Sequence, residues 1–292
     1  MESPDLRIFQ AVAREGSITR AATKLGYVQS NVTARIQQLE SELGTVLFFR
    51  HNRGMTLSSS GKALLAYADK IVGLLDEAAQ ALSSSSEPSG PLMIGSTQTA
   101  AAVRLPPIFV DYYKDHPHVQ LSLTTGNTQM LMEKVLHYEL DGAFIGCRCE
   151  HPELQSVPAF LEEVVIASHS AIETLEEAMK KPILVYCEGC SYRELLERWL
   201  QESGHTQSVK MEFGTLEAII GGISAGLGIS LLPRSVIVRQ EADGLIRAHA
   251  LPDSVNRMPT EFITRKDSFV SSALQAFIQT LPTARETAAG PV

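Results

Sequence analysis

The sequence predicts an α/β protein with a separate helical domain at its N-terminus, and three observations support this fold class. Residues 3–44 carry apolar side chains at helical spacing, in three runs separated by glycines. Residues 83–91, SSSSEPSGP, have the composition of a linker. Beyond residue 91, apolar runs typical of strands alternate with helical stretches, as in parallel sheets covered by helices. A chain of 292 residues is long enough for about two domains.

The first 44 residues predict three helices. Ser3 is the expected N-cap of the first, which ends at Gly16, and Ser17 caps the second, which ends at Gly26. The third carries an apolar stripe over residues 32–43. Two helices joined by a short turn that contains glycine are typical of a helix-turn-helix. The alternative is three amphipathic helices that pack on one another and bind no nucleic acid.

Residues 45–61, TVLFFRHNRGMTLSSSG, predict a small β-ribbon beside these helices. An apolar run is followed by a turn at residues 52–54 and a second extended piece at residues 55–57. The ribbon carries Arg50 and Arg53. We therefore expect a winged helix-turn-helix over residues 1–58.

Residues 59–87 are expected to form a long linker helix with its trailing segment. Apolar residues step alternately by four and three, which is the spacing of a coiled-coil seam. We assign dimerisation to this seam, with docking against the chain's own body as the alternative. The seam consists of Leu64, Ala68, Ile71, Leu75, Ala78 and Leu82.

The remaining residues predict an α/β body. Strands are expected at residues 92–96, 119–126, 141–146, 163–168, 182–187, 209–214 and 260–267, with helices such as 129–138, 192–201, 216–225 and 268–281. The glycine-rich stretch at residues 221–233, GGISAGLGISLLP, leads from a helix into a strand. A dinucleotide-binding loop leads from a strand into a helix, so we do not expect this stretch to bind a dinucleotide.

Charge and composition limit the classes of function. The net charge is −8, yet residues 14–53 hold six arginines and lysines against three glutamates. A basic N-terminal domain on an acidic body is compatible with phosphate contact by that domain alone. No apolar run approaches the roughly 18 to 20 residues of a membrane span, and the N-terminus lacks the layout of a signal peptide. We expect a cytoplasmic protein that does not bind membranes.

The chain resembles LysR-type transcriptional regulators from end to end. The motifs that carry the resemblance are AATKLG, QSNVTARIQQLESELG, LFFRHNRGMTLSSSG and GGISAGLGISLLP. The resemblance implies that residues 88–292 form an effector-binding domain of two Rossmann-like lobes, similar to periplasmic binding proteins. Lobe I would comprise about residues 91–161 and 266–292, and lobe II about residues 162–265.

The same resemblance implies which residues contact DNA. The start of the recognition helix would face the major groove, where amides can contact adenine and hydroxyls can contact bases or phosphates. Val28 stands where many relatives have a capping Ser or Thr, and Ser30 and Asn31 stand where they have Pro and Ala, so base preference cannot be transferred. The expected DNA-binding residues are Gln29, Ser30, Asn31, Thr33, Arg35, Arg50 and Arg53, with a solvated surface role as the alternative for each.

The resemblance also implies a small effector in the cleft between the lobes. Hydroxyls and backbone N–H groups at helix N-termini suit an anionic metabolite, although hydroxyls there can also simply cap helices. The expected effector-binding residues are Ser96, Thr97, Gln98, Thr99, Gly146, Ser191 and Thr215. The implied partners are double-stranded DNA, this effector, further copies of the chain in a homodimer or homotetramer, and RNA polymerase. No cofactor, resident metal or catalytic residue is expected.

Four cysteines leave a second function open. Cys147 and Cys149 form a C-x-C, and Cys187 and Cys190 form a C-x-x-C, on loops expected at the mouth of the cleft. Together they could sense redox state or bind a soft metal such as zinc or copper(I). Packing or ordinary ligand contact is the alternative. The absence of known catalytic motifs argues against an enzyme, and the arginines and amides argue against a binding protein that has lost its DNA role.

Overall fold

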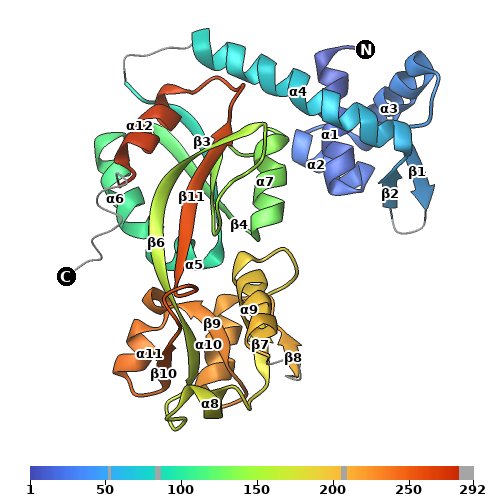
Figure 1. Cartoon of the computed structure of the whole chain (residues 1–292). Helices are drawn as coiled ribbons and strands as arrows, with labels where there is room; N and C mark the ends of the chain where they lie inside the picture. Colours follow the sequence, from blue (N-terminus) through green and yellow to red (C-terminus); the bar gives the residue numbers. More distant parts are fainter. Residues whose placement is uncertain (52–53, 83–86, 205–208, 283–292) are drawn as a thin grey trace. The chain divides into compact units, whose positions relative to one another are not determined.

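The computed structural model describes residues 1–51, 54–82, 87–204 and 209–282. The chain consists of two compact units, residues 1–84 and 85–292 (Figure 1). Arg53, one of the expected DNA-binding residues, lies outside the described residues. Within the described part of the chain, every helix is too short or too polar to cross a membrane.

The first unit contains three short helices, a two-stranded ribbon and one long helix. These are α1 (Ser3–Glu15), α2 (Ile18–Leu25), α3 (Gln29–Leu43), β1 (Phe48–His51), β2 (Gly54–Leu57) and α4 (Ser59–Leu82). Glu2 caps α1 in place of the expected Ser3, because Glu2 and Asp5 form a reciprocal capping box. Gly26 ends α2 at a φ of 70°, which an L side chain rarely adopts, and so allows the sharp turn into α3.

One hydrophobic core holds the first unit together. Phe9 is fully buried, and its ring lies 5.2 Å from that of Phe48 between centroids, which joins α1 to the ribbon. Val32 and Ile36 supply the apolar face of α3 to the same core. The polar face of α3 is consequently directed outward.

Buried polar contacts dock α4 onto α1. The Asp69 carboxylate, 3% exposed, accepts hydrogen bonds from Gln10 Nε2 at 2.6 Å and Arg14 Nη2 at 3.0 Å. A second pair, Arg7 and Asp76, lies one turn earlier on α1 and two turns later on α4, and is about half exposed. The α1 residues fall on one face because they are spaced by three and four.

The second unit contains the larger sheet and most of the helices. Its strands are β3 (Gly90–Ser96), β4 (Val119–Thr125), β5 (Gly142–Ile145), β6 (Leu154–His169), β7 (Ile183–Val185), β8 (Lys210–Glu212), β9 (Ser230–Pro233), β10 (Ile246–Ala250) and β11 (Arg257–Arg265). Its helices are α5 (Gln98–Val103), α6 (Leu105–Asp115), α7 (Thr128–Leu136), α8 (Leu175–Ala178), α9 (Ser191–Glu202), α10 (Leu216–Ser224), the 3-10 turn η1 (Arg234–Val236), α11 (Val238–Ala242) and α12 (Ser272–Thr280).

The sheet is mixed, whereas alternation along the chain predicted parallel pairing. β3 pairs in parallel with β4 and β5, and β7 pairs in parallel with β8 in a separate two-stranded sheet. β6 pairs antiparallel with β11, β9 and β10, and β11 pairs antiparallel with β5. The reason is that β6 runs from one lobe into the other, and β11 returns beside it in the opposite direction (Figure 1).

The crossing strands define the two lobes. The first half of β6, residues 154–163, pairs with β11, and the second half, residues 164–169, pairs with β9 and β10. Lobe I therefore contains β3, β4, β5, β11, the first half of β6 and helices α5, α6, α7 and α12. Lobe II contains the remaining elements. Because β11 pairs with β5 and β6, the chain returns to lobe I at about residue 257, earlier than the expected residue 266.

The contact between α1 and α4 can be tested by mutation. We expect Asp69→Asn to lower the free energy of unfolding by about 1.5–3 kcal/mol, because it removes a buried charged acceptor shared by Gln10 and Arg14. Asp76→Asn, at the half-exposed pair, should cost no more than about 1 kcal/mol. Urea unfolding followed by circular dichroism would measure both. Equal losses would show that burial does not distinguish the two carboxylates.

Candidate functional site: a helix-turn-helix surface and an inter-lobe cavity

The first turn of α3 presents a polar surface. Gln29, Ser30 and Asn31 are all exposed. Val28 precedes the helix in an extended conformation, makes no side-chain cap, and is 70% exposed. The backbone N–H groups at this end of α3 therefore lack a side-chain cap from residue 28.

Two hydroxyls at this helix have protein partners. Thr33 Oγ1 donates to the Gln29 carbonyl of the preceding turn at 2.9 Å. Thr19 Oγ1, on α2, donates to Gln29 Oε1 at 3.2 Å. Thr33 is half-buried and bonded to its own helix, whereas the Gln29 amide is held by the neighbouring helix.

The expected basic residues separate into two environments. Arg35 Nη1 lies 3.0 Å from Asp5 Oδ1, and Asp5 is buried, so this pair joins α3 to the start of α1. Arg50 lies exposed on the ribbon strand β1, opposite Met55. Arg35 therefore has a structural contact, and Arg50 is available to a partner of the ribbon.

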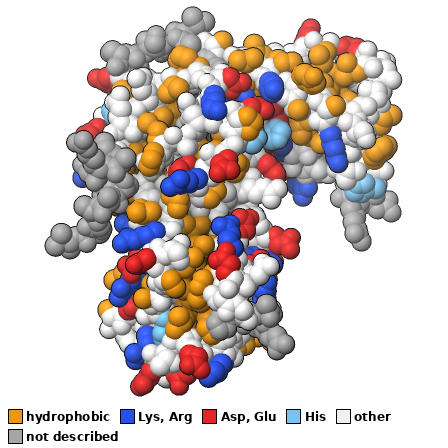
Figure 2. Space-filling model, viewed as in Figure 1, with side chains coloured by type: hydrophobic (Ala, Val, Ile, Leu, Met, Phe, Trp, Pro, Cys, Tyr) orange, Lys and Arg blue, Asp and Glu red, His pale blue; other side chains and the backbone are white. Residues whose placement is uncertain are grey.

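The expected seam on α4 is divided between core and surface. Ala68 is fully buried and Leu64 packs against the same core, as the alternative of docking on the chain's own body predicted. Ile71 and Leu75 are 38% and 44% exposed, and they adjoin the exposed Tyr67 and Leu74. Hydrophobic side chains lie along α4 in Figure 2. The side chain of Leu82 lies outside the described part of the chain.

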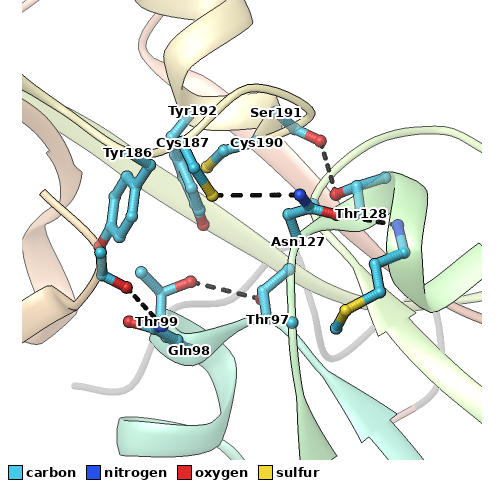
Figure 3. A pocket seen from close by; sticks show the side chains of 14 residues that line it. Thr97, Gln98, Thr99, Asn127, Thr128, Tyr186, Cys187, Cys190, Ser191 and Tyr192 are labelled. Carbon is cyan, nitrogen blue, oxygen red and sulfur yellow. Dashed lines mark hydrogen bonds between the residues drawn. The ribbon is translucent and has the colours of Figure 1, made fainter. Parts of the chain in front are cut away.

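A cavity of about 210 Å³ lies between lobe I and lobe II (Figure 3). The loops and helix starts that follow the strands of both lobes supply its walls. Among the described residues that line it, none carries a charged side chain. The lining residues are Thr97, Gln98, Thr99, Gly126, Asn127, Thr128, Met130, Gly146, Tyr186, Cys187, Cys190, Ser191, Tyr192 and Gly214.

Five of the seven expected effector residues line this cavity. They are Thr97, Gln98, Thr99, Gly146 and Ser191. The Ser96 side chain is instead fully buried, and its hydroxyl donates to the Thr97 carbonyl at 2.9 Å. Thr215 accepts from Ala218 N at 3.2 Å as the N-cap of α10, so its hydroxyl has the capping role that was the alternative.

Hydrogen bonds connect the lobes across the cavity. Gln98, from lobe I, donates to the Gly214 carbonyl at 3.2 Å and accepts from Leu216 N at 2.8 Å. Thr128 and Ser191 hydroxyls lie 2.8 Å apart.

Asn127 makes a third connection between the lobes. Its Nδ2 donates to the Glu188 carbonyl of lobe II at 2.9 Å, while its Oδ1 caps α7. Sequence reasoning missed this residue and Thr128, although a Gly-Asn-Thr run directly after a strand is a signal for a helix cap at the edge of the sheet.

Two tyrosines form the lobe II side of the cavity. Figure 3 shows both rings pointing toward Gln98 and Thr99. Burial raises the pKa of both Tyr186 and Tyr192, so both hydroxyls are neutral donors at ordinary pH. Tyr192 also bonds to Thr99, which partly offsets the rise in its pKa. The Tyr186 hydroxyl is buried and makes no hydrogen bond to the described protein atoms.

The four cysteines separate into two pairs. No group of three or more His, Cys, Asp or Glu residues in the described chain is arranged to hold a metal ion. Cys187 and Cys190 line the cavity, whereas Cys147 and Cys149 pack beside the α7 core of lobe I. Burial raises the pKa of Cys147 and Cys190.

Comparison with known proteins assigns both units to one family. The family model "Bacterial regulatory helix-turn-helix protein, lysR family" matches residues 4–62, and "LysR substrate binding domain" matches residues 85–285. The HTH-type transcriptional regulator YusT of Bacillus subtilis (strain 168) is 70% identical over 278 residues, which cover 95% of this chain and 94% of the relative.

Solved structures have the same fold. A full-length cysteine-to-aspartate variant of OxyR from Pseudomonas aeruginosa is 21% identical, with a TM-score of 0.72 over 96% of this chain and 94% of that one. Full-length CbnR in complex with its target DNA is 22% identical, with a TM-score of 0.69 over 98% of this chain and 100% of that one. The matching families and relatives are transcriptional regulators, not enzymes. This chain therefore belongs to the LysR family and is a DNA-binding transcriptional regulator with a substrate-binding domain.

Proposed function

We propose that a small molecule bound in the inter-lobe cavity controls how this regulator binds or bends DNA. In this proposal residues 1–58 bind DNA, residues 59–87 link and dimerise, and residues 88–292 bind the effector. The observation that carries it is the buried hydroxyl of Tyr186, a residue that lines the cavity, because this hydroxyl makes no hydrogen bond to the described protein atoms. A buried polar group without a partner costs about 1–3 kcal/mol, and a ligand that accepts its hydrogen bond would recover that free energy.

The lining favours an effector rich in acceptor oxygens. Hydroxyls of Thr97, Thr99 and Tyr186 and the backbone at the start of α9 are donors, and no basic side chain lines the cavity. A small carboxylate would therefore be held by hydrogen bonds and the helix dipole rather than by an ion pair. The volume of about 210 Å³ suits a metabolite of a few carbons better than a dinucleotide.

Transmission would depend on the hydrogen bonds that already cross the cavity. Gln98 and Asn127 each contact the backbone of lobe II from lobe I. A ligand that contacts both lobes would shift the population toward one arrangement of the lobes, by as much as its affinity differs between arrangements. That shift would reset the angle between DNA-binding units in the assembled protein.

For DNA recognition we assign base contact to the exposed first turn of α3. Gln29, Ser30 and Asn31 would read base edges, and Arg50 on the ribbon would contact phosphate. Thr33 and Arg35 act indirectly in this proposal, because each is bonded within the unit. Arg53 is assigned to phosphate on its place in the sequence alone.

We assign self-association to the exposed part of α4. Tyr67, Ile71, Leu74 and Leu75 recur at helical spacing and leave an apolar face that a second copy of α4 could cover. A homodimer formed in this way would place two recognition helices on one DNA, and pairing of two dimers would give a homotetramer.

The whole proposal is tested by footprinting the purified protein on DNA upstream of its own gene, at about 150 mM salt because phosphate contacts depend on salt. An interrupted palindrome of protection supports a dimeric regulator. A change in the protected length on adding a small carboxylate supports effector control. Protection that no member of a carboxylate panel alters would leave DNA binding standing and contradict this class of effector.

Replacing the amides should reduce sequence preference. We expect Gln29→Ala and Asn31→Ala each to lower the ratio of specific to nonspecific affinity. The free-energy difference between specific and nonspecific binding should fall by about 1–3 kcal/mol, because a lost bidentate base contact has that effect. Arg35→Ala is the matched control on the same helix and should lower stability through Asp5 instead. Competition with random DNA would measure the ratio. An unchanged ratio in both amide variants would remove α3 from base readout.

Replacing the ribbon arginine should weaken binding to all sequences alike. Loss of one phosphate contact in Arg50→Ala should reduce the slope of log affinity against log salt by about 1. The exposed Arg239 on α11, in the other unit, is a control that should leave the slope unchanged. Fluorescence anisotropy across a salt series would measure both, and equal slopes for wild type and Arg50→Ala would exclude phosphate contact.

Removing the unsatisfied hydroxyl should separate stability from ligand binding. We expect Tyr186→Phe to raise the unfolding free energy of the unliganded protein by about 1 kcal/mol or more, because a buried orphan donor is removed. The same variant should lose most of any thermal shift that a carboxylate gives the wild type. A destabilised variant that keeps its ligand response would contradict both expectations.

A further inference from the structure

Two of the cysteines flank a tight turn at the edge of the cavity. Cys187 and Cys190 precede and follow the turn at Glu188 and Gly189, between β7 and α9. Gly189 has a φ of 80°, as the third position of a type II turn requires. The Cα atoms that flank a β-turn lie within about 7 Å, and disulfides span Cα separations of about 4.4–6.8 Å. The turn thus places the Cα atoms of Cys187 and Cys190 within the range that a disulfide spans.

The two thiols differ in access. Cys187 is exposed and lies within 4.0 Å of Asn127 Nδ2. Cys190 packs into the cores of lobe II at the start of the 12-residue helix α9. Burial raises the pKa of Cys190, the backbone N–H groups of Arg193 and Tyr192 counteract this rise, and the nearby Cys187 adds to it. One thiol is therefore open to solvent, and its neighbour is sheltered at a helix start.

The other two cysteines form a separate pair. Cys147 interacts with Cys149 and with the Ser191 hydroxyl. Cys147 and Cys149 do not line the cavity, and both pack against the α7 core. They supply a matched control for any chemistry at the C-x-x-C.

We propose that Cys187 and Cys190 are a redox-active pair that closes to an intramolecular disulfide by exchange with a small organic disulfide. The Cys187 thiolate attacks one sulfur of the oxidant, whose other half leaves as a thiolate. Cys190, after losing its proton to solvent, then attacks the Cys187 sulfur and releases the second thiol. The protein loses two electrons and two protons, and one oxidant disulfide becomes two thiols.

The position of the turn connects this chemistry to the lobes. Asn127 of lobe I donates to the Glu188 carbonyl within the turn, and its Nδ2 lies 3.2 Å from where a Cβ on Gly189 would stand. A disulfide across the turn would alter this contact and replace both thiols of the cavity wall. This consequence for DNA binding rests on the proposed function, whereas formation of the disulfide does not.

The chemistry is tested on the folded full-length protein. The protein is equilibrated in buffers of oxidised and reduced glutathione, quenched with acid, alkylated with N-ethylmaleimide and weighed by mass spectrometry. We expect two of the four thiols to become protected together, and peptide mapping to join Cys187 to Cys190. A Cys147–Cys190 or Cys147–Cys149 disulfide, or four free thiols at every ratio, would overturn the proposal.

Variants test the order of the steps. Cys190→Ser should accumulate a mixed disulfide with glutathione on Cys187, because the second attack is lost. Cys187→Ser should accumulate none, because the sheltered thiol lacks access. The Cys147→Ser/Cys149→Ser double variant should oxidise as the wild type does. Accumulation on Cys190 in place of Cys187 would overturn the assigned order.

The connection to DNA needs its own measurement. We expect oxidised and reduced wild type to differ at least about fivefold in affinity for DNA upstream of the protein's own gene, the lower end of ordinary coupling between sites. The Cys187→Ser variant should show one affinity under both conditions. Equal wild-type affinities alongside a mapped disulfide would overturn the regulatory role alone. Failure of both forms to bind that DNA in a folded protein would instead contradict the proposed function.

Discussion

The antiparallel pairing of β6 with β11 is the constraint on which the second unit depends. β6 runs through both lobes without a break, so its 16 residues set the axis that both lobes share. Each lobe adds its own strands to one end, β5 and β11 in lobe I and β9 and β10 in lobe II. Loops after the other strands therefore converge beside this axis, and the cavity forms where they meet.

The cavity is lined by neutral polar groups, and not all of them have hydrogen-bond partners among the described protein atoms. Hydrogen bonds between the lobes are made by the side chains of Gln98, Asn127, Thr128 and Ser191. The buried hydroxyl of Tyr186, in contrast, makes no hydrogen bond to the described protein atoms. Charges would be costly to bury in a cavity of this size without fixed partners. Neutral hydrogen-bond donors avoid that cost and still favour ligands that carry hydrogen-bond acceptors. The exposed thiol of Cys187 adds a group whose reactivity depends on its chemical surroundings.

Sequence reasoning succeeded where one local signal dominates and failed where long-range pairing decides. Glycines and apolar stripes predicted α2, α3 and the ribbon, and the polar run after β3 predicted Thr97, Gln98 and Thr99 in the lobe I wall of the cavity. The first half of β6 was missed because it contains Pro158 and exposed side chains, which disfavour a strand. Its register against β11 shifts next to that proline, between Thr260 and Glu261. The pairs Arg35 with Asp5 and Asp69 with Gln10 join residues 30 and 59 positions apart, and no local pattern marks them.

The apolar face of α4 has a consequence for how much folded protein exists at a given cellular abundance. Tyr67, Ile71, Leu74 and Leu75 remain in water while the chain is alone, and burying them against a second copy would stabilise the native state by mass action. Stability would then rise with the amount of regulator present. When few copies are present, the N-terminal unit would unfold and be degraded more often. Degradation would therefore set a concentration below which the regulator does not persist.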